Sequence, residues 1–180
     1  MLKKILKTLG AILVIAIAGI LIYAKGQPDM LKVERSVIIA APAAKIFPLI
    51  NDLHSWNDWS PFEHRDPNMR RTFSGSAKGE GAAYEWNGNS EVGSGRMEIV
   101  KSMSPSQIVI KLDFISPFEG HDTAEFHLDS QGNSTKVTWS MFGPQSYVGK
   151  VMCVFMDMDS MIGKDFNEGL GKLKSIAEKH

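Results

Sequence analysis

The chain has 180 residues, 43% hydrophobic and 22% charged, which is ordinary for a globular protein and predicts one domain with an appendage. Its net charge is zero, but four lysines precede residue 26, leaving 16 basic against 20 acidic residues beyond it. A mildly acidic domain without a basic block is a poor candidate for binding nucleic acid. The one cysteine, Cys153, excludes an intramolecular disulfide and a Cys-rich zinc site.

The N-terminal segment predicts a membrane anchor. Residues 8–24 carry no charge and no proline, and with Ile5 and Leu6 they are long enough to cross a hydrocarbon core of about 30 Å. Three lysines precede the segment and one follows it, which predicts a cytoplasmic N-terminus and an extracytoplasmic domain on a single-pass cell-membrane protein. The alternative is a signal peptide cleaved near Ala18, which would release a secreted or periplasmic protein.

We therefore divide the chain into an anchor (1–25), a linker (26–31) and a ligand-binding domain (32–180). The domain opens with a Val- and Ile-rich strand at 32–40, followed by a short helix at 43–51 that Pro48 shortens or kinks. Gly93 and Gly95 predict a bulge or sharp bend. Six further strands are predicted at 69–73, 80–87, 91–103, 107–116, 123–129 and 136–142.

The last segment, residues 147–178, predicts one long helix. Its apolar residues from Val148 through Phe155 to Leu173 fall on one stripe at helical spacing. The order of elements predicts an α+β fold of the helix-grip kind, in which a curved antiparallel seven-stranded sheet wraps around the C-terminal helix. A sheet that grips a helix tends to leave a cavity suited to an apolar ligand.

With these elements, the chain resembles the SRPBCC superfamily of START lipid-transfer domains and polyketide cyclase-like proteins, with a transmembrane helix before the domain. The resemblance covers residues 32–180. It rests on the Glu34-Arg35-Ser36-Val37-Ile38-Ile39 strand, the Ala41-Pro42-Ala43-Ala44-Lys45-Ile46-Phe47 helix start, the Trp56-Asn57-Asp58-Trp59-Ser60-Pro61-Phe62 segment and the long late helix. It implies a hydrophobic tunnel between sheet and helix. Only some members are enzymes, and no catalytic set is shared by all.

Aromatic residues supply most of the candidate ligand contacts, because several of them in one small domain suit a cavity with apolar walls and a few hydrogen bonds. Plain core filling is the competing reading for each. Asp159 lies on the predicted apolar stripe, with Arg71 as its candidate partner. A partly exposed acid at a helix flank, a buried ion pair that holds the helix to the sheet, or a ligand-contacting or proton-transferring acid would each explain it. The candidates are Trp56, Trp59, Arg71, Tyr84, Trp86, Phe114, Phe126, Trp139, Phe155, Asp159 and Ile162.

Three residues are candidates for catalysis: Asp159 and the adjacent pair His121 and Asp122. Neighbouring strand residues point to opposite faces of a sheet, which argues against cooperation within the pair. The histidines lack metal-ligand spacing, so we predict no metal and no cofactor. Cys153 has no adjacent base and is a poor nucleophile.

The leading hypothesis is therefore binding of a hydrophobic small molecule, lipid or polyketide-like, at the membrane surface and without turnover. The alternatives are a cyclase or dehydratase that uses one of the three candidate residues, and a module that binds another protein through the outer sheet face. Ligand identity and oligomeric state do not follow from the sequence.

Overall fold

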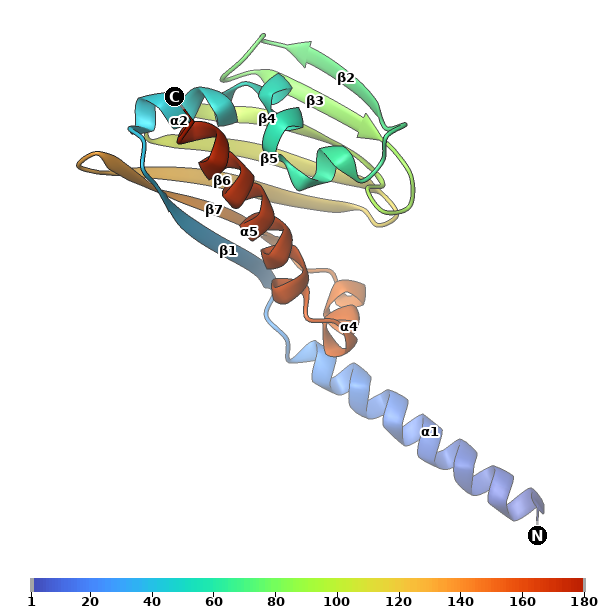
Figure 1. Ribbon diagram of the computed structural model, residues 1–180. Helices are drawn as coiled ribbons and strands as arrows, with labels where there is room; N and C mark the ends of the chain where they lie inside the picture. Colours follow the sequence, from blue (N-terminus) through green and yellow to red (C-terminus); the bar gives the residue numbers. More distant parts are fainter. Residues whose placement is uncertain (1, 180) are drawn as a thin grey trace.

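The computed structural model describes residues 2–179 (Figure 1). Met1 and His180, the outer bounds of the first and last predicted units, lie outside these residues. The helices are α1 (Leu2–Lys25), α2 (Ala43–Asn51), α3 (Trp56–Trp59), α4 (Tyr147–Phe155) and α5 (Met158–Ala177), with 3-10 turns η1 (Leu53–Ser55) and η2 (Pro61–His64). The strands are β1 (Met30–Ile39), β2 (Arg70–Gly75), β3 (Ala82–Asn87), β4 (Ser94–Met103), β5 (Gln107–Ser116), β6 (Gly120–Gln131) and β7 (Ser134–Pro144).

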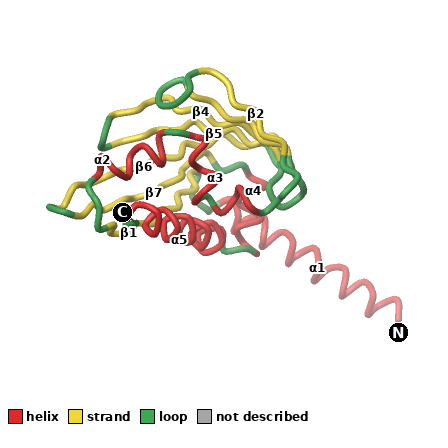
Figure 2. The backbone as a smooth tube through the Cα atoms, turned by 45° about the horizontal axis from the view of Figure 1, so that its top comes forward, coloured by secondary structure: helices red, strands yellow, loops and turns green. Residues whose placement is uncertain are grey.

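The described strands form one antiparallel seven-stranded sheet in the order β1-β7-β6-β5-β4-β3-β2. The chain thus runs through hairpins from β2 to β7, and β1 closes the order by pairing with the last strand, Met30 opposite Pro144. Helices α2, α3 and α5 lie on one face of this curved sheet, α5 crosses it, and α4 lies beyond the end of the sheet beside α1 (Figures 1 and 2). This arrangement confirms the predicted helix-grip fold.

The core lies between the concave sheet face and α5. Alternation along each strand turns its apolar residues toward the helix, as with Ile108 and Ile110 of β5 and Phe126 of β6, which are fully buried. From α5, Phe166, Leu170 and Leu173 pack against them at helical spacing. Together with Ile46 and Ile50 of α2, these residues form one buried cluster.

The predicted bend in β4 is confirmed. Gly93 has a φ of +61°, and the pairing of β4 with β5 shifts register between Ser94 and Gly95. Gly95 also lies against the indole of Trp86, because a Cβ at this position would come within 2.4 Å of the ring. The bend therefore depends on a residue without a side chain, and it sets the position of Trp86. The helix at 43–51 runs its predicted length despite Pro48.

The prediction of one long C-terminal helix is wrong in detail, because the segment forms two helices. Met156 is extended, with φ −130° and ψ 128°, and Asp157 caps the second helix by accepting a hydrogen bond from the Ser160 amide at 3.0 Å. A single helical stripe across 147–178 is therefore broken. Phe155, placed on that stripe, is 69% exposed instead of buried.

Helix α1 projects away from the domain (Figure 1). Among the described residues, the segment Lys3–Lys25 of this helix is the one candidate for spanning a bilayer, judged by its length and apolar composition. It joins β1 through residues 26–29 and packs against α4 at its C-terminal end. We call the end of the sheet where β1 begins the anchor end; because the strands alternate in direction, β4 and β6 also begin there and β5 and β7 end there.

Candidate functional site

A cavity of about 330 Å³ lies between the concave face of the sheet, the first half of α5 and the turns around η2. This volume is within the range of about 300–1,000 Å³ that is typical of small-molecule sites. Its wall is mostly apolar: Trp56, Phe62, Met69, Tyr84, Trp86, Val92, Met97, Ile110, Leu112, Phe114, Ala124, Trp139, Met141, Ile162 and Phe166. The polar residues of the wall are Ser60, Glu63, Arg65, Glu91 and Asp165.

One side of the cavity is closed by a block of stacked aromatic rings. Trp139 of β7 lies parallel to Phe166 of α5, with ring centroids 4.0 Å apart, and stacks on Phe126 at 5.0 Å. Trp56 and Trp59 meet this block edge-on. Their indole nitrogens donate to backbone carbonyls of α2, both at 2.9 Å. The block fills the space toward α2, so the open volume remains between β3–β5 and the first half of α5.

A buried polar network forms another part of the wall. Glu63 is 7% exposed, and its two carboxylate oxygens accept hydrogen bonds from Arg71 Nε at 2.7 Å and from the Tyr84 hydroxyl at 2.8 Å. The Arg71 guanidinium also donates to the Glu63 backbone carbonyl at 2.7 Å. Burial, and then the charge of Glu63, raise the pKa of Tyr84 above its ordinary value. These bonds tie η2 to β2 and β3 and leave the Glu63 carboxylate paired.

One polar atom of the wall residues has no partner. The indole Nε1 of Trp139 is the one buried side-chain nitrogen or oxygen in the described chain that makes no hydrogen bond. A buried donor without an acceptor is costly, so an orphan of this kind calls for an explanation.

The Arg65–Asp165 ion pair joins the turn after η2 to α5, and the Arg65 guanidinium lies 5.1 Å from the centre of the Phe62 ring.

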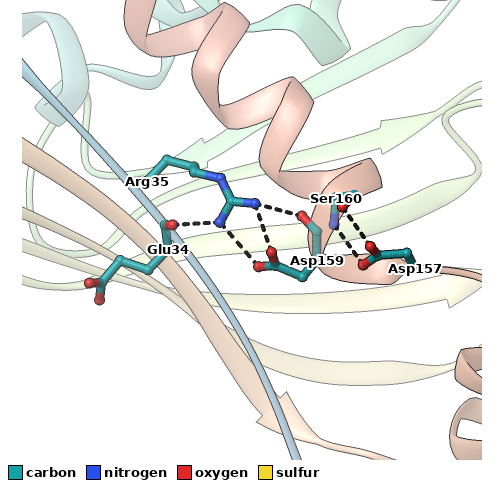
Figure 3. Close-up of polar contacts among 5 residues, drawn as sticks. All are labelled: Glu34, Arg35, Asp157, Asp159 and Ser160. Carbon is teal, nitrogen blue, oxygen red and sulfur yellow. Dashed lines mark hydrogen bonds and ion pairs between the residues drawn. The ribbon is translucent and has the colours of Figure 1, made fainter.

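The predicted pairing of Asp159 with Arg71 is wrong. Asp159 lies in the first turn of α5, 56% exposed, and accepts hydrogen bonds from Arg35 of β1 at 2.8 and 3.1 Å (Figure 3). The guanidinium also donates to the Asp159 backbone carbonyl at 2.9 Å. Because a new helix begins at Met158, an angular position counted from Phe155 does not apply here. Neither Phe155 nor Asp159 belongs to the cavity wall.

The other catalytic candidates also lie apart from each other. His121 is exposed and pairs with Asp113 at 2.7 Å, and this hydrogen bond raises the pKa of His121 above its ordinary value. Asp122 points to the opposite, concave face beside Gly143, where burial raises the pKa of its carboxyl group. The two side chains therefore do not form a catalytic pair. None of the three candidates is a wall residue.

The remaining predicted contacts divide into two groups. Trp59 and Phe126 are fully buried behind the cavity as core residues, and Arg71 is held by Glu63. The predicted residues that the structure places on the cavity wall are Trp56, Tyr84, Trp86, Phe114, Trp139 and Ile162.

Sequence reasoning missed the acid and the ion pair of the wall. Arg65 and Asp165, which pair with each other, are a hundred residues apart in sequence. Glu63 lies only 8 residues from Arg71, but it comes from an irregular turn whose geometry no periodic pattern predicts. One sequence pattern did point to part of this network: Arg71 shares its strand spacing with Met69 and Phe73, which predicts that its side chain faces the interior. The pattern does not indicate which acidic residue pairs with it. No group of His, Cys, Asp or Glu side chains suited to a metal ion occurs among residues 2–179.

The sequence of residues 30–178 matches a family model described as "Polyketide cyclase / dehydrase and lipid transport". The chain belongs to this family. The match covers the whole sheet and both C-terminal helices, and begins after α1. A comparison with functionally characterised protein sequences found no match.

Solved structures share the fold at low sequence identity. The Zhui aromatase/cyclase from a Streptomyces species superposes with a TM-score of 0.60 at 13% identity, over 83% of this chain and 94% of that chain. A protein from Thermobifida fusca gives 0.60 at 20% identity, over 83% and 95%. The di-domain ARO/CYC protein BexL gives 0.63 at 11% identity, over 88% of this chain but 53% of its own length. Likeness at these identities shows the common fold.

Proposed function

We propose that the domain binds a hydrophobic small molecule, lipid or polyketide-like, in the cavity between the sheet and α5. The observation that carries the proposal is the cavity itself, about 330 Å³ in volume with an aromatic and aliphatic wall. Membership in a family of cyclases and lipid-transport proteins supports a ligand of this kind. Trp56, Tyr84, Trp86, Phe114, Trp139 and Ile162 are the predicted contacts that lie on this wall and would touch it.

The energetics of such a ligand are favourable. Burial of about 300–500 Å² of apolar ligand surface at roughly 25 cal/mol per Å² gives about 7–12 kcal/mol of gross stabilisation. After an association cost of about 4 kcal/mol, about 3–8 kcal/mol remains, which corresponds to dissociation constants from several millimolar for the smallest buried area to about micromolar for the largest. The orphan Nε1 of Trp139 favours a ligand that carries an acceptor, such as a carbonyl or hydroxyl oxygen, if a small ring movement brings the two together.

We further propose that α1 stays attached and holds the domain at the membrane. Its length and apolar composition support a membrane span, and the lysines on either side support a cytoplasmic N-terminus. Residues 1–25 would then be the anchor, 26–31 the linker and 32–180 the binding domain. A signal peptide would instead be removed, which intact-mass measurement of the mature protein tests directly.

Native mass spectrometry of the full chain, purified from membranes in detergent, tests the binding proposal. Wild type is expected to carry a small-molecule adduct. The variant Leu112→Trp/Ala124→Leu places larger side chains on the cavity wall and is expected to lose it. The matched control Lys111→Trp/Thr123→Leu changes the neighbouring positions on the convex face and is expected to keep it. Ligand-free wild type, or equal adducts in both variants, would contradict binding in this cavity.

A further inference from the structure

The exposed apolar side chains of the domain gather at the anchor end. Between residues 26 and 179, twelve large hydrophobic residues are exposed, and eight of them lie on the sheet, hairpin and helix segments of this end. We define the anchor-end surface by six of these: Ile115, Phe118, Tyr147, Val148, Phe155 and Met161. Monomeric soluble proteins rarely expose so many apolar residues together, so this surface calls for a partner.

The topology brings these residues together from distant parts of the sequence. Because β5 ends and β6 begins at the anchor end, the hairpin that carries Phe118 lies there, with Phe114 paired to Gly120 at its base. Because β7 ends at the same edge, α4 and the start of α5 follow there as well. In both views α4 lies beside the C-terminal end of α1 (Figures 1 and 2).

Helix α4 has an inverted burial pattern. A surface helix of a soluble protein buries its apolar residues and exposes its charged ones. In α4 the single charged residue, Lys150, is 8% exposed and pairs with Asp29 of the linker, whereas Val148 and Phe155 face outward. This arrangement is stable where the outer surroundings are apolar, and it is costly in water.

Two hydrogen bonds and one ion pair tie α4 and the residues just before it to the end of α1 and to the linker. The Tyr147 hydroxyl donates to the Leu21 carbonyl at 2.9 Å, the Gln145 amide donates to the Asp29 carbonyl at 2.8 Å, and Lys150 pairs with Asp29. Since Leu21 belongs to the apolar helix itself, α4 lies at the depth where that helix leaves the bilayer. This step rests on our proposal that α1 spans the membrane.

We propose that the anchor-end surface lies in the lipid interface, with α4 and the β5–β6 hairpin embedded among the headgroups. The occupant of this surface is the bilayer itself, continuous with the lipid around α1. An apolar surface of this kind inserts a short distance below the headgroups. The charged residues directly beside its apolar side chains in sequence are acidic, Glu119 beside Phe118 and Asp157 beside Phe155, so we expect no added attachment of these side chains by anionic lipid.

Spin-label accessibility on the full chain in phosphatidylcholine vesicles tests the proposal. In a Cys153→Ser background, a nitroxide is attached at Phe118→Cys, at Phe155→Cys, or at Met103→Cys, an exposed position on the opposite end of the sheet. The labels at 118 and 155 are expected to be relaxed several-fold more by oxygen, relative to a water-soluble nickel complex, than the label at 103. Adding phosphatidylserine is expected to leave that ratio unchanged.

Equal access of the nickel complex to all three labels would overturn the proposal. Labels at 118 and 155 that are shielded from both reagents, with spin–spin broadening between chains, would assign the surface to a second copy and overturn it too. A further label at Val14→Cys in α1 separates this outcome from a failure of the anchor, because it reports the span independently. Circular dichroism confirms that each labelled chain is folded.

Discussion

Removing the negative charge of Glu63 while keeping its shape is expected to destabilise the domain strongly. In Glu63→Gln, an amide replaces two carboxylate oxygens that now accept from Arg71 at 2.7 Å and from Tyr84 at 2.8 Å. The amide has only one oxygen, so its NH₂ group must face one of the two donors. Arg71 can only donate, so the amide oxygen stays with Arg71 and the NH₂ group faces the Tyr84 hydroxyl, which must then accept instead of donate. The variant therefore loses the charge that strengthens both hydrogen bonds and leaves the Tyr84 O–H without its acceptor.

The magnitude follows from those contacts. A hydrogen bond to a charged group contributes about 1.5–3 kcal/mol, and breaking a buried pair costs about 3–5 kcal/mol. Because a quarter of the Arg71 side chain is exposed, with 26% of its surface accessible, water recovers part of that cost. We expect the free energy of unfolding to fall by about 2–4 kcal/mol, which lowers the melting temperature by about 4–16 °C in a domain of this size.

The assay is chemical unfolding of the full chain in detergent, followed by tryptophan fluorescence. The matched control is Glu85→Gln on the outer face of the same β3 strand, where the exposed pair with Arg96 at 3.6 Å is worth less than about 1 kcal/mol. Tyr84→Phe is expected to cost about 1–2 kcal/mol by itself, and its effect should shrink in the Glu63→Gln background. A Glu63→Gln variant as stable as its Glu85→Gln control would refute the account of this network.

Three further changes have definite expected outcomes. Gly95→Ala is expected to lower stability by about 1–3 kcal/mol and to weaken ligand adducts in native mass spectrometry. The new methyl group would come within 2.4 Å of the Trp86 indole and 2.5 Å of the Asp113 backbone carbonyl oxygen, so both the ring and the β4–β5 pairing must shift. Asp122→Asn is expected to raise the melting temperature at pH 7, because the raised pKa of Asp122 means that the folded state disfavours its carboxylate form. This gain should vanish below the pKa of Asp122 in the unfolded chain, where the carboxyl group is protonated in both states. A gain that is the same at every pH would contradict the prediction. Asp159→Asn is expected to cost less than about 1 kcal/mol and to leave ligand adducts unchanged, since its pair with Arg35 is exposed and outside the cavity wall; loss of the adduct would return Asp159 to the site.

The architecture was predictable because its signals are local. Alternation in stretches such as Ile108 to Phe114 follows from the two-residue repeat of a strand, and the strand boundaries agree with the prediction to within a few residues. The bend at Gly93 and Gly95 was visible as glycines inside a strand pattern. The break at Met156 and Asp157 was missed because apolar residues recur at helical spacing on both sides of it, although the chain changes direction there.

The site was only partly predictable, because partners across the fold are not encoded in local spacing. Composition and the spacing of the tryptophans along the strands and helices predicted that they lie between the sheet and α5. Whether Trp59 or Trp139 borders the cavity depends on the packing of the whole core. The identity of Arg71's acid depended on where an irregular turn places Glu63.

The amino-acid sequence by itself determined which segments are strands, which are helices and which is apolar enough for a membrane, since each is a property of ten to twenty consecutive residues. Tertiary structure decided which acid meets which base, how much space remains unfilled, and that α4 turns Lys150 inward and Phe155 outward. Those outcomes depend on strand register, sheet curvature and the direction in which a helix restarts. Such quantities are fixed by the packing of the whole domain, including contacts such as Arg35 with Asp159 and Lys150 with Asp29, whose residues are more than a hundred positions apart.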